Sequence, residues 1–323
     1  MWTEILAIIG GFALLTWSAD RFVVGASAIA YILKVSPLII GLTIVGLGTS
    51  APEMLVSAVA SWQGNAGLAV GNALGSNIIN TGLILGLTAM IIPLNVHSSI
   101  IRRELPVLLL VMMIALLLLL DGTLGRLDGT LLLTGMAVVL LWVIRVGLTP
   151  QTPEDPMGDE FADEIPTDMG MGRAIFWLIV GGLCLLGSSR LLVWGAVSIA
   201  ESMGISDLVI GLTIVALGTS LPELAASVMS AIKNEHDIAL GNVIGSNIFN
   251  LLAVLGLPGL INPGPVDAEV LSRDYPVMVG LTVALFVMAY GFRGPGRINR
   301  VEGTLLVVGF CAYQTLLYFN ELA

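Results

Sequence analysis

The sequence predicts an all-α integral membrane protein whose ten transmembrane helices form two inverted five-helix repeats. Of its 323 residues, 56% are hydrophobic and only 11% are charged, and the mean hydropathy is +0.97. A soluble chain carries about a quarter charged residues. The apolar residues gather into runs of about 20, the length that crosses a hydrocarbon core of about 30 Å. The second half of the chain also repeats the first half at a constant offset.

The apolar runs define the predicted helices in chain order. The first run is too long for the apolar core of a cleavable signal, so we expect it to remain as the first helix and to direct insertion. The predicted spans are residues 5–33, 36–61, 68–92, 105–121, 126–147, 173–201, 206–232, 238–261, 275–291 and 302–319.

The basic residues predict that both termini lie outside the plasma (bacterial inner) membrane. Cytoplasmic connections collect Lys and Arg, and an outside N-terminus places nine such residues inside and two outside. The inner set is Lys34, Arg102, Arg103, Arg145, Arg173, Lys233, Arg293, Arg297 and Arg300, and the outer set is Arg126 and Arg273. Arg21 and Arg190 remain within helices.

One polar interval, residues 148–172, separates a first repeat at 1–147 from a second at 173–323. It contains seven acidic residues and no basic residue before Arg173. A folded domain needs about 50 residues or more, so we expect a disordered, acidic cytoplasmic linker. The alternative is a segment that attracts cations with low affinity.

The two halves are copies of one another. Residues 41–87 and 211–257 align without a gap at an offset of 170 and are identical at 23 of 47 positions. Each half has five predicted spans, and because five is odd, the second copy enters the membrane from the opposite side. The halves are therefore predicted to be inverted repeats whose centres meet near the bilayer midplane.

The first shared motif reads GLGTSAPE in one copy and ALGTSLPE in the other. Residues at spacings of three and four share a helix face, and here they are two hydroxyls and a carboxylate: Thr49, Ser50 and Glu53, then Thr219, Ser220 and Glu223. Pro52 and Pro222 have no N–H, so the carbonyls four residues earlier lose their helical partners. The sequence predicts a broken helix with oxygen ligands in each repeat.

The second shared motif reads GNALGSNIIN and GNVIGSNIFN. It places a hydroxyl and an amide on one face of the next helix, as Ser76 with Asn80 and as Ser246 with Asn250. The G-x-x-x-G spacings, Gly71 with Gly75 and Gly241 with Gly245, predict close helix approach. Asn72, Asn77, Asn242 and Asn247 are expected to support the site or pack rather than to bind an ion directly.

Carboxylate, hydroxyl, amide and carbonyl oxygens are the ligands of hard cations, above all Ca²⁺. The absence of Cys and His from the set disfavours Zn²⁺ and Cu⁺. A single hydroxyl or amide can serve merely to hold helices together. A carboxylate at the membrane centre costs roughly 2.5 kcal/mol or more, so two symmetric ones favour a bound cation.

The predicted first helix of each repeat carries a charge, Asp20 in one and Arg190 in the other, at corresponding positions. A salt bridge between them is one hypothesis. The alternative is that each side chain snorkels to the membrane interface.

These motifs resemble those of the calcium/cation antiporter superfamily, whose two repeats carry G-T-S-x-P-E and G-N-x-x-G-S-N. The similarity extends over all ten spans, and connections such as HSSIIRRELP and SRDYPVM are similar to those of the bacterial inner-membrane YrbG-type sodium/calcium exchangers. The resemblance implies that Glu53 and Glu223 are the central carboxylates of an ion site. Potassium-dependent members place an aspartate where Asn250 stands, which argues against potassium co-transport.

The resemblance and the charge of the site together predict an antiporter that exchanges Ca²⁺ for Na⁺ by alternating access. Two ionised glutamates carry about −2, which one Ca²⁺ or two to three Na⁺ offset, and an empty site would bury both charges at several kcal/mol each. A proton-coupled exchanger, a cation channel and an intramembrane acid protease are the alternatives. We expect no enzyme activity, no cofactor and no nucleic acid partner. The expected form is a monomer whose partners are Ca²⁺, Na⁺ and the lipid bilayer.

Overall fold

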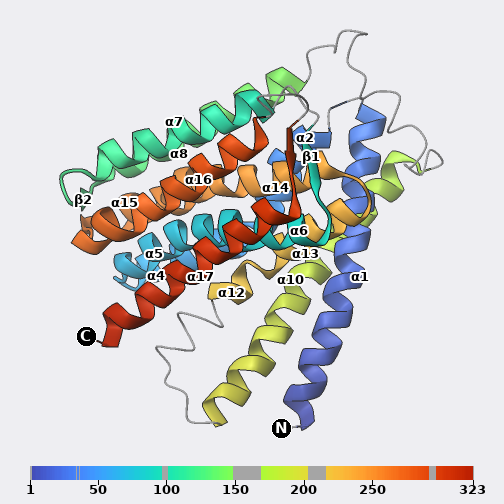
Figure 1. Cartoon of the computed structure of the whole chain (residues 1–323), viewed down its shortest axis with the longest axis horizontal. Helices are drawn as coiled ribbons and strands as arrows, with labels where there is room; N and C mark the ends of the chain where they lie inside the picture. Colours follow the sequence, from blue (N-terminus) through green and yellow to red (C-terminus); the bar gives the residue numbers. More distant parts are fainter. Residues whose placement is uncertain are drawn as a thin grey trace.

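The computed structural model describes residues 2–33, 35, 37–96, 101–147, 169–202, 216–290 and 296–322, and this part of the chain is almost entirely helical (Figure 1). The predicted acidic linker lies outside it except for residues 169–172. The predicted seventh span is described only from residue 216 onward. Because residues 148–168 are not described, the disorder expected of the linker stays a prediction.

The described elements follow a similar order in the two halves, except that residues 203–215 are not described and that the second half has an additional π-helical segment at residues 270–274. In the first half they are α1 (Trp2–Leu33), α2 (Pro37–Ile40), the π-helix η1 (Gly41–Val45), α3 (Gly46–Thr49), α4 (Ala51–Trp62), α5 (Ala66–Ile78), the π-helix η2 (Ile79–Ile84), α6 (Leu85–Ile91), β1 (Leu94–Val96), α7 (Ile101–Leu119), β2 (Thr123–Leu124) and α8 (Arg126–Gly147). In the second half they are α10 (Met171–Ser202), α12 (Ala216–Thr219), α13 (Leu221–Ile232), α14 (His236–Phe249), the π-helix η4 (Asn250–Val254), α15 (Gly256–Ile261), β3 (Gly264–Pro265), the π-helix η5 (Val270–Asp274), α16 (Tyr275–Ala289), β4 (Gly296–Ile298) and α17 (Arg300–Leu322).

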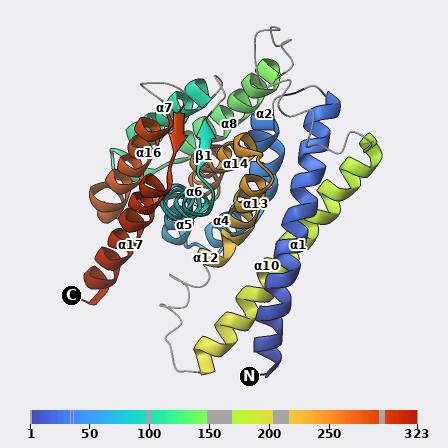
Figure 2. The same ribbon diagram turned by 45° about the vertical axis from the view of Figure 1, so that its right-hand side comes forward.

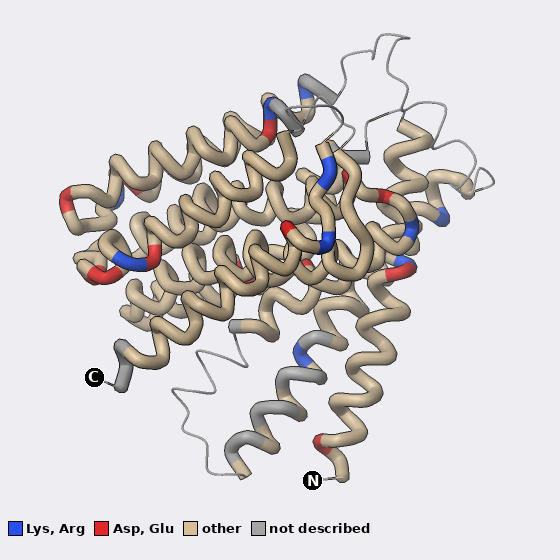
Figure 3. Tube along the Cα trace, in the orientation of Figure 1, with Lys and Arg blue, Asp and Glu red and all other residues tan. Residues whose placement is uncertain are grey.

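The described helices are long and apolar enough for a multi-pass membrane protein. Seven of them qualify as membrane spans by length and composition, or eight when the bent pair around Ser50 is counted as one more. Charged residues gather at the helix ends and connections (Figure 3), while side chains such as Phe12, Val138 and Leu305 are exposed along the helices. An apolar surface of this kind suits lipid contact.

Helices α1 and α10 lie side by side along one edge of the molecule (Figures 1 and 2). Glycines let their backbones approach closely. A Cβ atom at Gly25 would lie 2.5 Å from the Leu178 nitrogen, and one at Gly181 would lie 2.6 Å from the Phe22 nitrogen. Small residues at such crossings are typical of membrane helices, where packing drives association.

Asp20 of α1 was predicted to pair with Arg190 of α10, but the structure pairs it with Lys233. Asp20 of α1 lies 2.7 Å from the ammonium group of Lys233, at the C-terminal end of α13. Arg190 is exposed. The hypothesis of an Asp20–Arg190 bridge is therefore wrong, because Asp20 faces α13 rather than its counterpart on α10.

Two short β-ribbons join the halves. β1 of the first half pairs antiparallel with β4 of the second, and β2 of the first half pairs antiparallel with β3 of the second. α7 runs from just after β1 to just before β2, and its 19 residues span roughly 28 Å at about 1.5 Å per residue. The ribbons therefore lie at opposite ends of the helix bundle (Figure 1).

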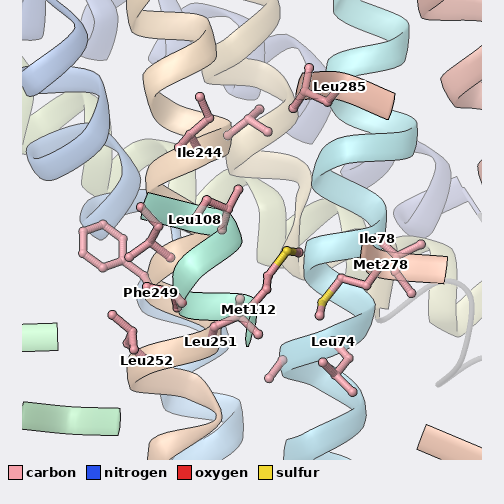
Figure 4. Close-up of a cluster of buried hydrophobic side chains, with 14 of the residues drawn as sticks. Leu74, Ile78, Leu108, Met112, Ile244, Phe249, Leu251, Leu252, Met278 and Leu285 are labelled. Atoms are coloured by element: carbon pink, nitrogen blue, oxygen red, sulfur yellow. The ribbon is translucent and has the colours of Figure 1, made fainter. Parts of the chain in front are cut away.

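The main hydrophobic core lies among α5, α7, α14 and α16. Figure 4 shows Leu108 and Met112 of α7 facing Ile244 and Phe249 of α14, with Met278 of α16 beside them. This packing holds the central helices, α5 and α14, in place. Both of them carry most of the second motif and continue directly into the π-helical segments η2 and η4, which contain its last Asn, Asn80 or Asn250.

Candidate functional site

Each copy of the first motif forms a broken helix, as the sequence predicts. The helix axis turns by 49° between residues 41–49 and residues 51–62. Ser50 has φ −81° and ψ 3°, and Ser220 has nearly the same values, −90° and 2°. Pro52 and Pro222 follow in the first turn of the next helix, where the missing N–H costs nothing.

The break brings each glutamate to the serine of the other half. Ser50 Oγ donates a hydrogen bond to Glu223 Oε1 at 3.2 Å, and Ser220 Oγ donates to Glu53 Oε1 at 3.5 Å. Both carboxylates are buried, each with 1% of its surface exposed. The two motifs thus meet in the protein interior through a reciprocal pair of contacts.

The second oxygen of each carboxylate has no hydrogen-bond partner among the described residues. The same is true of Asn77 Oδ1, Asn80 Oδ1 and both amide atoms of Asn250, all of which are buried. A buried polar oxygen without a hydrogen-bond partner lowers the stability of the fold by about 1–3 kcal/mol, and a charged one lowers it by more. The unpartnered oxygens of Glu53, Glu223, Asn80 and Asn250 are of the kind that suits a hard cation.

Asparagines hold the glutamate backbones in equivalent ways. Asn72 Nδ2 donates to the Glu53 carbonyl at 3.1 Å, and Asn242 Nδ2 donates to the Glu223 carbonyl at 3.2 Å. Asn242 also donates to Ser227 Oγ at 2.9 Å and accepts a hydrogen bond from Thr49 Oγ1 at 3.1 Å. Asn72 and Asn242 therefore position the carboxylate-bearing turn, in agreement with the supporting role predicted for them.

The second motif lies in the same region. Asn80 Nδ2 donates to Asn247 Oδ1 at 3.1 Å, across the two halves, and Asn247 in turn donates to Thr81 Oγ1 at 2.9 Å. Ser246 Oγ donates to the Gly46 carbonyl at 3.5 Å. Ser76 is buried, whereas Thr219 is half-buried and has a contact of its own.

The π-helical segments were not predicted from the sequence. η2 and η4 contain Asn80 and Asn250 at corresponding positions. A π-turn adds a residue to the helical turn and occurs often at functional sites. An Asn in a largely apolar run accompanies η2 and η4, but η1 contains none, so the residue does not mark a π-helical segment.

The predicted close approach of glycines is confirmed in one copy. A Cβ atom at Gly245 would lie 2.4 Å from the Leu42 carbonyl oxygen, so α14 crosses η1 at backbone contact. Gly71 and Gly75 have nothing within 4 Å in the described part of the chain. Residue 212, which corresponds to Leu42, lies outside the described residues.

Among the described residues, His, Cys, Asp and Glu side chains form no group of three or more that could hold a metal ion. This result agrees with the composition of the candidate site, in which two carboxylates are combined with hydroxyls and amides. Such a set favours Ca²⁺ or Na⁺ over Zn²⁺.

This architecture defines a multi-pass helical membrane protein in which two broken helices bring their acidic motifs together in the interior. The chain belongs to the sodium/calcium exchanger family. The family described as "Sodium/calcium exchanger protein" matches residues 3–145 and 173–319. Members of this family are transporters rather than enzymes.

Two relatives and one solved structure illustrate the similarity. The chain is 51% identical over 318 residues to CaxA of Alkalimonas amylolytica, covering 98% of this chain and 99% of the relative. It is 44% identical over 313 residues to the inner membrane protein YrbG of Escherichia coli K12, covering 97% and 96%. The structure is similar to that of the sodium-calcium exchanger NCX_Mj, with a TM-score of 0.83 and 33% identity over 97% of each chain.

Proposed function

We propose that this protein is a secondary-active antiporter that exchanges Ca²⁺ for Na⁺ across the plasma (inner) membrane. The observation that carries the proposal is the pair of buried carboxylates, Glu53 and Glu223. Each is hydrogen-bonded through one oxygen to the other half, while its second oxygen has no partner in the described part of the chain. The family and the structural similarity to a sodium-calcium exchanger support it.

The proposed ion ligands are the two glutamates together with the hydroxyl, amide and carbonyl oxygens around them. The further ligands are Thr49, Ser50, Ser76, Asn80, Thr219, Ser220, Ser246 and Asn250. Asn250 supports this assignment best among them, because both its amide atoms are buried and have no hydrogen-bond partner among the residues that the structure describes.

Ten helices in two inverted repeats, residues 1–147 and 173–323, form the proposed framework. The equivalent elements of the two halves and the ribbons at opposite ends of the bundle support this arrangement. A pseudo-two-fold axis in the membrane plane places the site near the bilayer midplane, where alternating access operates.

The charge of the site explains why such a protein would exchange ions rather than conduct them. Two ionised carboxylates carry about −2, which either Ca²⁺ or Na⁺ ions neutralise. Closing the site around two bare carboxylates would cost several kcal/mol for each charge. The loaded protein therefore changes its access from one side to the other far more readily than the empty protein.

The test is ⁴⁵Ca²⁺ uptake into vesicles that contain the purified protein, driven in turn by Na⁺, K⁺ and H⁺ gradients. We expect uptake with the Na⁺ gradient alone, and its loss in both Glu53→Gln and Glu223→Gln. Glu269→Gln is the control, because Glu269 is 71% exposed and pairs with Arg273, one helical turn further along the chain, rather than with a residue of the candidate site. This variant should keep full uptake.

The other outcomes would replace the proposal. Uptake driven only by H⁺ would indicate a proton-coupled cation exchanger. Ca²⁺ flux that needs no opposing gradient would indicate a channel. Full uptake after both glutamate substitutions would remove the assigned site.

A further inference from the structure

A second candidate site lies far from the carboxylates, at the end of the bundle that carries the β1–β4 ribbon. A groove of about 790 Å³ is lined there by Pro93, Arg297, Asn299, Arg300, Val301 and Glu302. It lies against β4 and the first turn of α17. Figure 3 shows the basic residues on β4 and at the start of α17.

The two arginines of the groove have no acidic partner among the residues that the structure describes. Both are exposed, and neither has a carboxylate within 4 Å among the described residues. Within the described ranges, the one hydrogen bond that the Arg300 side chain makes is to the Ile91 carbonyl, at 3.4 Å. The Glu302 carboxylate lies in the groove as well, but it accepts a hydrogen bond from the Asn299 nitrogen at 2.8 Å.

The N-terminal end of α17 adds to the positive character of the groove. Asn299 Oδ1 caps the helix by accepting hydrogen bonds from the nitrogens of Val301 and Glu302. The helix dipole places a partial positive charge at this end. The guanidinium groups of Arg297 and Arg300, which have no carboxylate partner among the described residues, line the same groove, and each offers a planar fork of donors that matches phosphate oxygens.

The groove also has an exposed apolar border. Val301 is 69% exposed, Leu305 on the next turn of α17 is 57% exposed, and Ile91 at the end of α6 is 50% exposed. A small soluble anion would use the arginines and leave this aliphatic surface in water. An amphipathic molecule with a phosphate head and an acyl tail would cover both.

We propose that this groove binds an anionic phospholipid, with the headgroup phosphate on Arg297 and Arg300 and the acyl chain along Val301 and Leu305. The site joins the two halves, because β1 comes from the first and β4 from the second. The bound lipid therefore stabilises the folded protein by adding contacts that exist only when the ribbon is formed.

The test measures lipid binding to the full chain in detergent by native mass spectrometry and by the shift in melting temperature. The probes are phosphatidylglycerol, phosphatidylcholine and inorganic phosphate. We expect phosphatidylglycerol to bind at least tenfold more tightly than phosphatidylcholine and to raise the melting temperature. The double variant Arg297→Gln/Arg300→Gln should lose at least tenfold of that affinity.

The matched control is Arg173→Gln, since Arg173 is an exposed arginine on α10, outside the groove. It should bind phosphatidylglycerol as the wild type does. Val301→Asp keeps both arginines and places a carboxylate in the first turn of α17, where the helix dipole tolerates a negative charge. It should also weaken phosphatidylglycerol binding at least fivefold. This variant serves as an independent test if the double variant folds poorly.

Unchanged phosphatidylglycerol binding in both groove variants overturns the proposal. So does equal binding of phosphatidylcholine. If inorganic phosphate gives the same stabilisation and displaces the lipid, the groove is a site for soluble anions and the lipid assignment is wrong.

Discussion

At the scale of single residues, the two halves use equivalent asparagines unequally. Asn242 is fully buried, donates to the Glu223 carbonyl and to Ser227, and accepts from Thr49. Asn72 is half-buried and makes only the bond to the Glu53 carbonyl among the interactions of the described residues. The geometry of Glu223 therefore depends more strongly on its asparagine than the geometry of Glu53 does.

We expect Asn242→Leu to destabilise the protein more than Asn72→Leu. The first change removes two donated hydrogen bonds from buried acceptors, at about 1–3 kcal/mol for each group left without a partner, and the second removes one. Thermal unfolding in detergent measures the difference, and Ca²⁺ uptake should fall in the same order. A larger effect of Asn72→Leu would contradict this inequality.

The residues of the candidate site were largely predictable from the sequence, because the duplicated motifs place acids and hydroxyls where a membrane span should be apolar. Their mutual contacts were not. Nothing in a helix-face argument shows that Ser50 reaches Glu223 rather than Glu53 of its own copy. That contact depends on the crossing of the two broken helices, which is a property of the tertiary fold.

At the scale of the elements, the α1–α10 pair is defined by glycines at its contact points. Gly25 faces the α10 backbone, with the Leu178 nitrogen 2.5 Å and the Ala174 oxygen 2.8 Å from the position of a Cβ atom. Gly10 of the same helix has nothing within 4 Å among the described residues. The two glycines therefore form a matched pair for testing the packing.

Gly25→Ala should lower the melting temperature, because a methyl group cannot fit and the helices must separate; overpacking of this kind costs about 1–3 kcal/mol. Gly10→Ala should leave it unchanged or raise it slightly, since alanine favours the helix by up to about 1 kcal/mol. Thermal unfolding of both variants checks the prediction. Equal destabilisation by the two changes would show that the contact does not govern the pair.

The ion pair between α1 and α13 offers a second test at this scale. Asp20 and Lys233 are each about 30% exposed, so the pair should contribute only about 0–1 kcal/mol. A double-mutant cycle with Asp20→Asn and Lys233→Gln should give a measurable coupling energy of that size. The same cycle with Arg190→Gln should give none; coupling to Arg190 instead would revive the hypothesis that the structure contradicts.

The elements also show where sequence patterns stop being informative. Pro52 and Pro222 mark both helix breaks, because proline has a local steric effect that is visible in the sequence. The π-segments η1, η2 and η4 have no such marker, since an extra residue in a helical turn is stabilised by neighbouring helices rather than by its own residue types. The partner of Asp20 was also unpredictable, because the pairing with Lys233 depends on how α1 packs against α13 and not on the residues near Asp20 in the sequence.

At the scale of the whole molecule, the two ribbons provide evidence about topology. Each one pairs a connection of the first half with a connection of the second, and α7 separates them by roughly a bilayer thickness. The basic residues Arg103, Arg297 and Arg300 belong to elements that adjoin the β1–β4 ribbon, whereas Arg126 and Arg273 belong to elements that adjoin the β2–β3 ribbon. The orientation predicted from Lys and Arg therefore places β1–β4 in the cytoplasm.

Cysteine labelling tests this orientation directly. The two native cysteines, Cys184 and Cys311, are first replaced by alanine so that a single new cysteine reports one position. Thr123→Cys on the exposed face of β2 should react with a membrane-impermeant maleimide in intact cells, and Asn299→Cys beside β4 should react only after permeabilisation. The positive-inside rule predicts which of the two sites lies outside the cell. Because α7 spans the membrane between them, the two sites must lie on opposite sides. Labelling of Asn299→Cys alone in intact cells would invert the orientation while leaving the fold intact, whereas labelling of both sites from outside would contradict the membrane-spanning position of α7 itself.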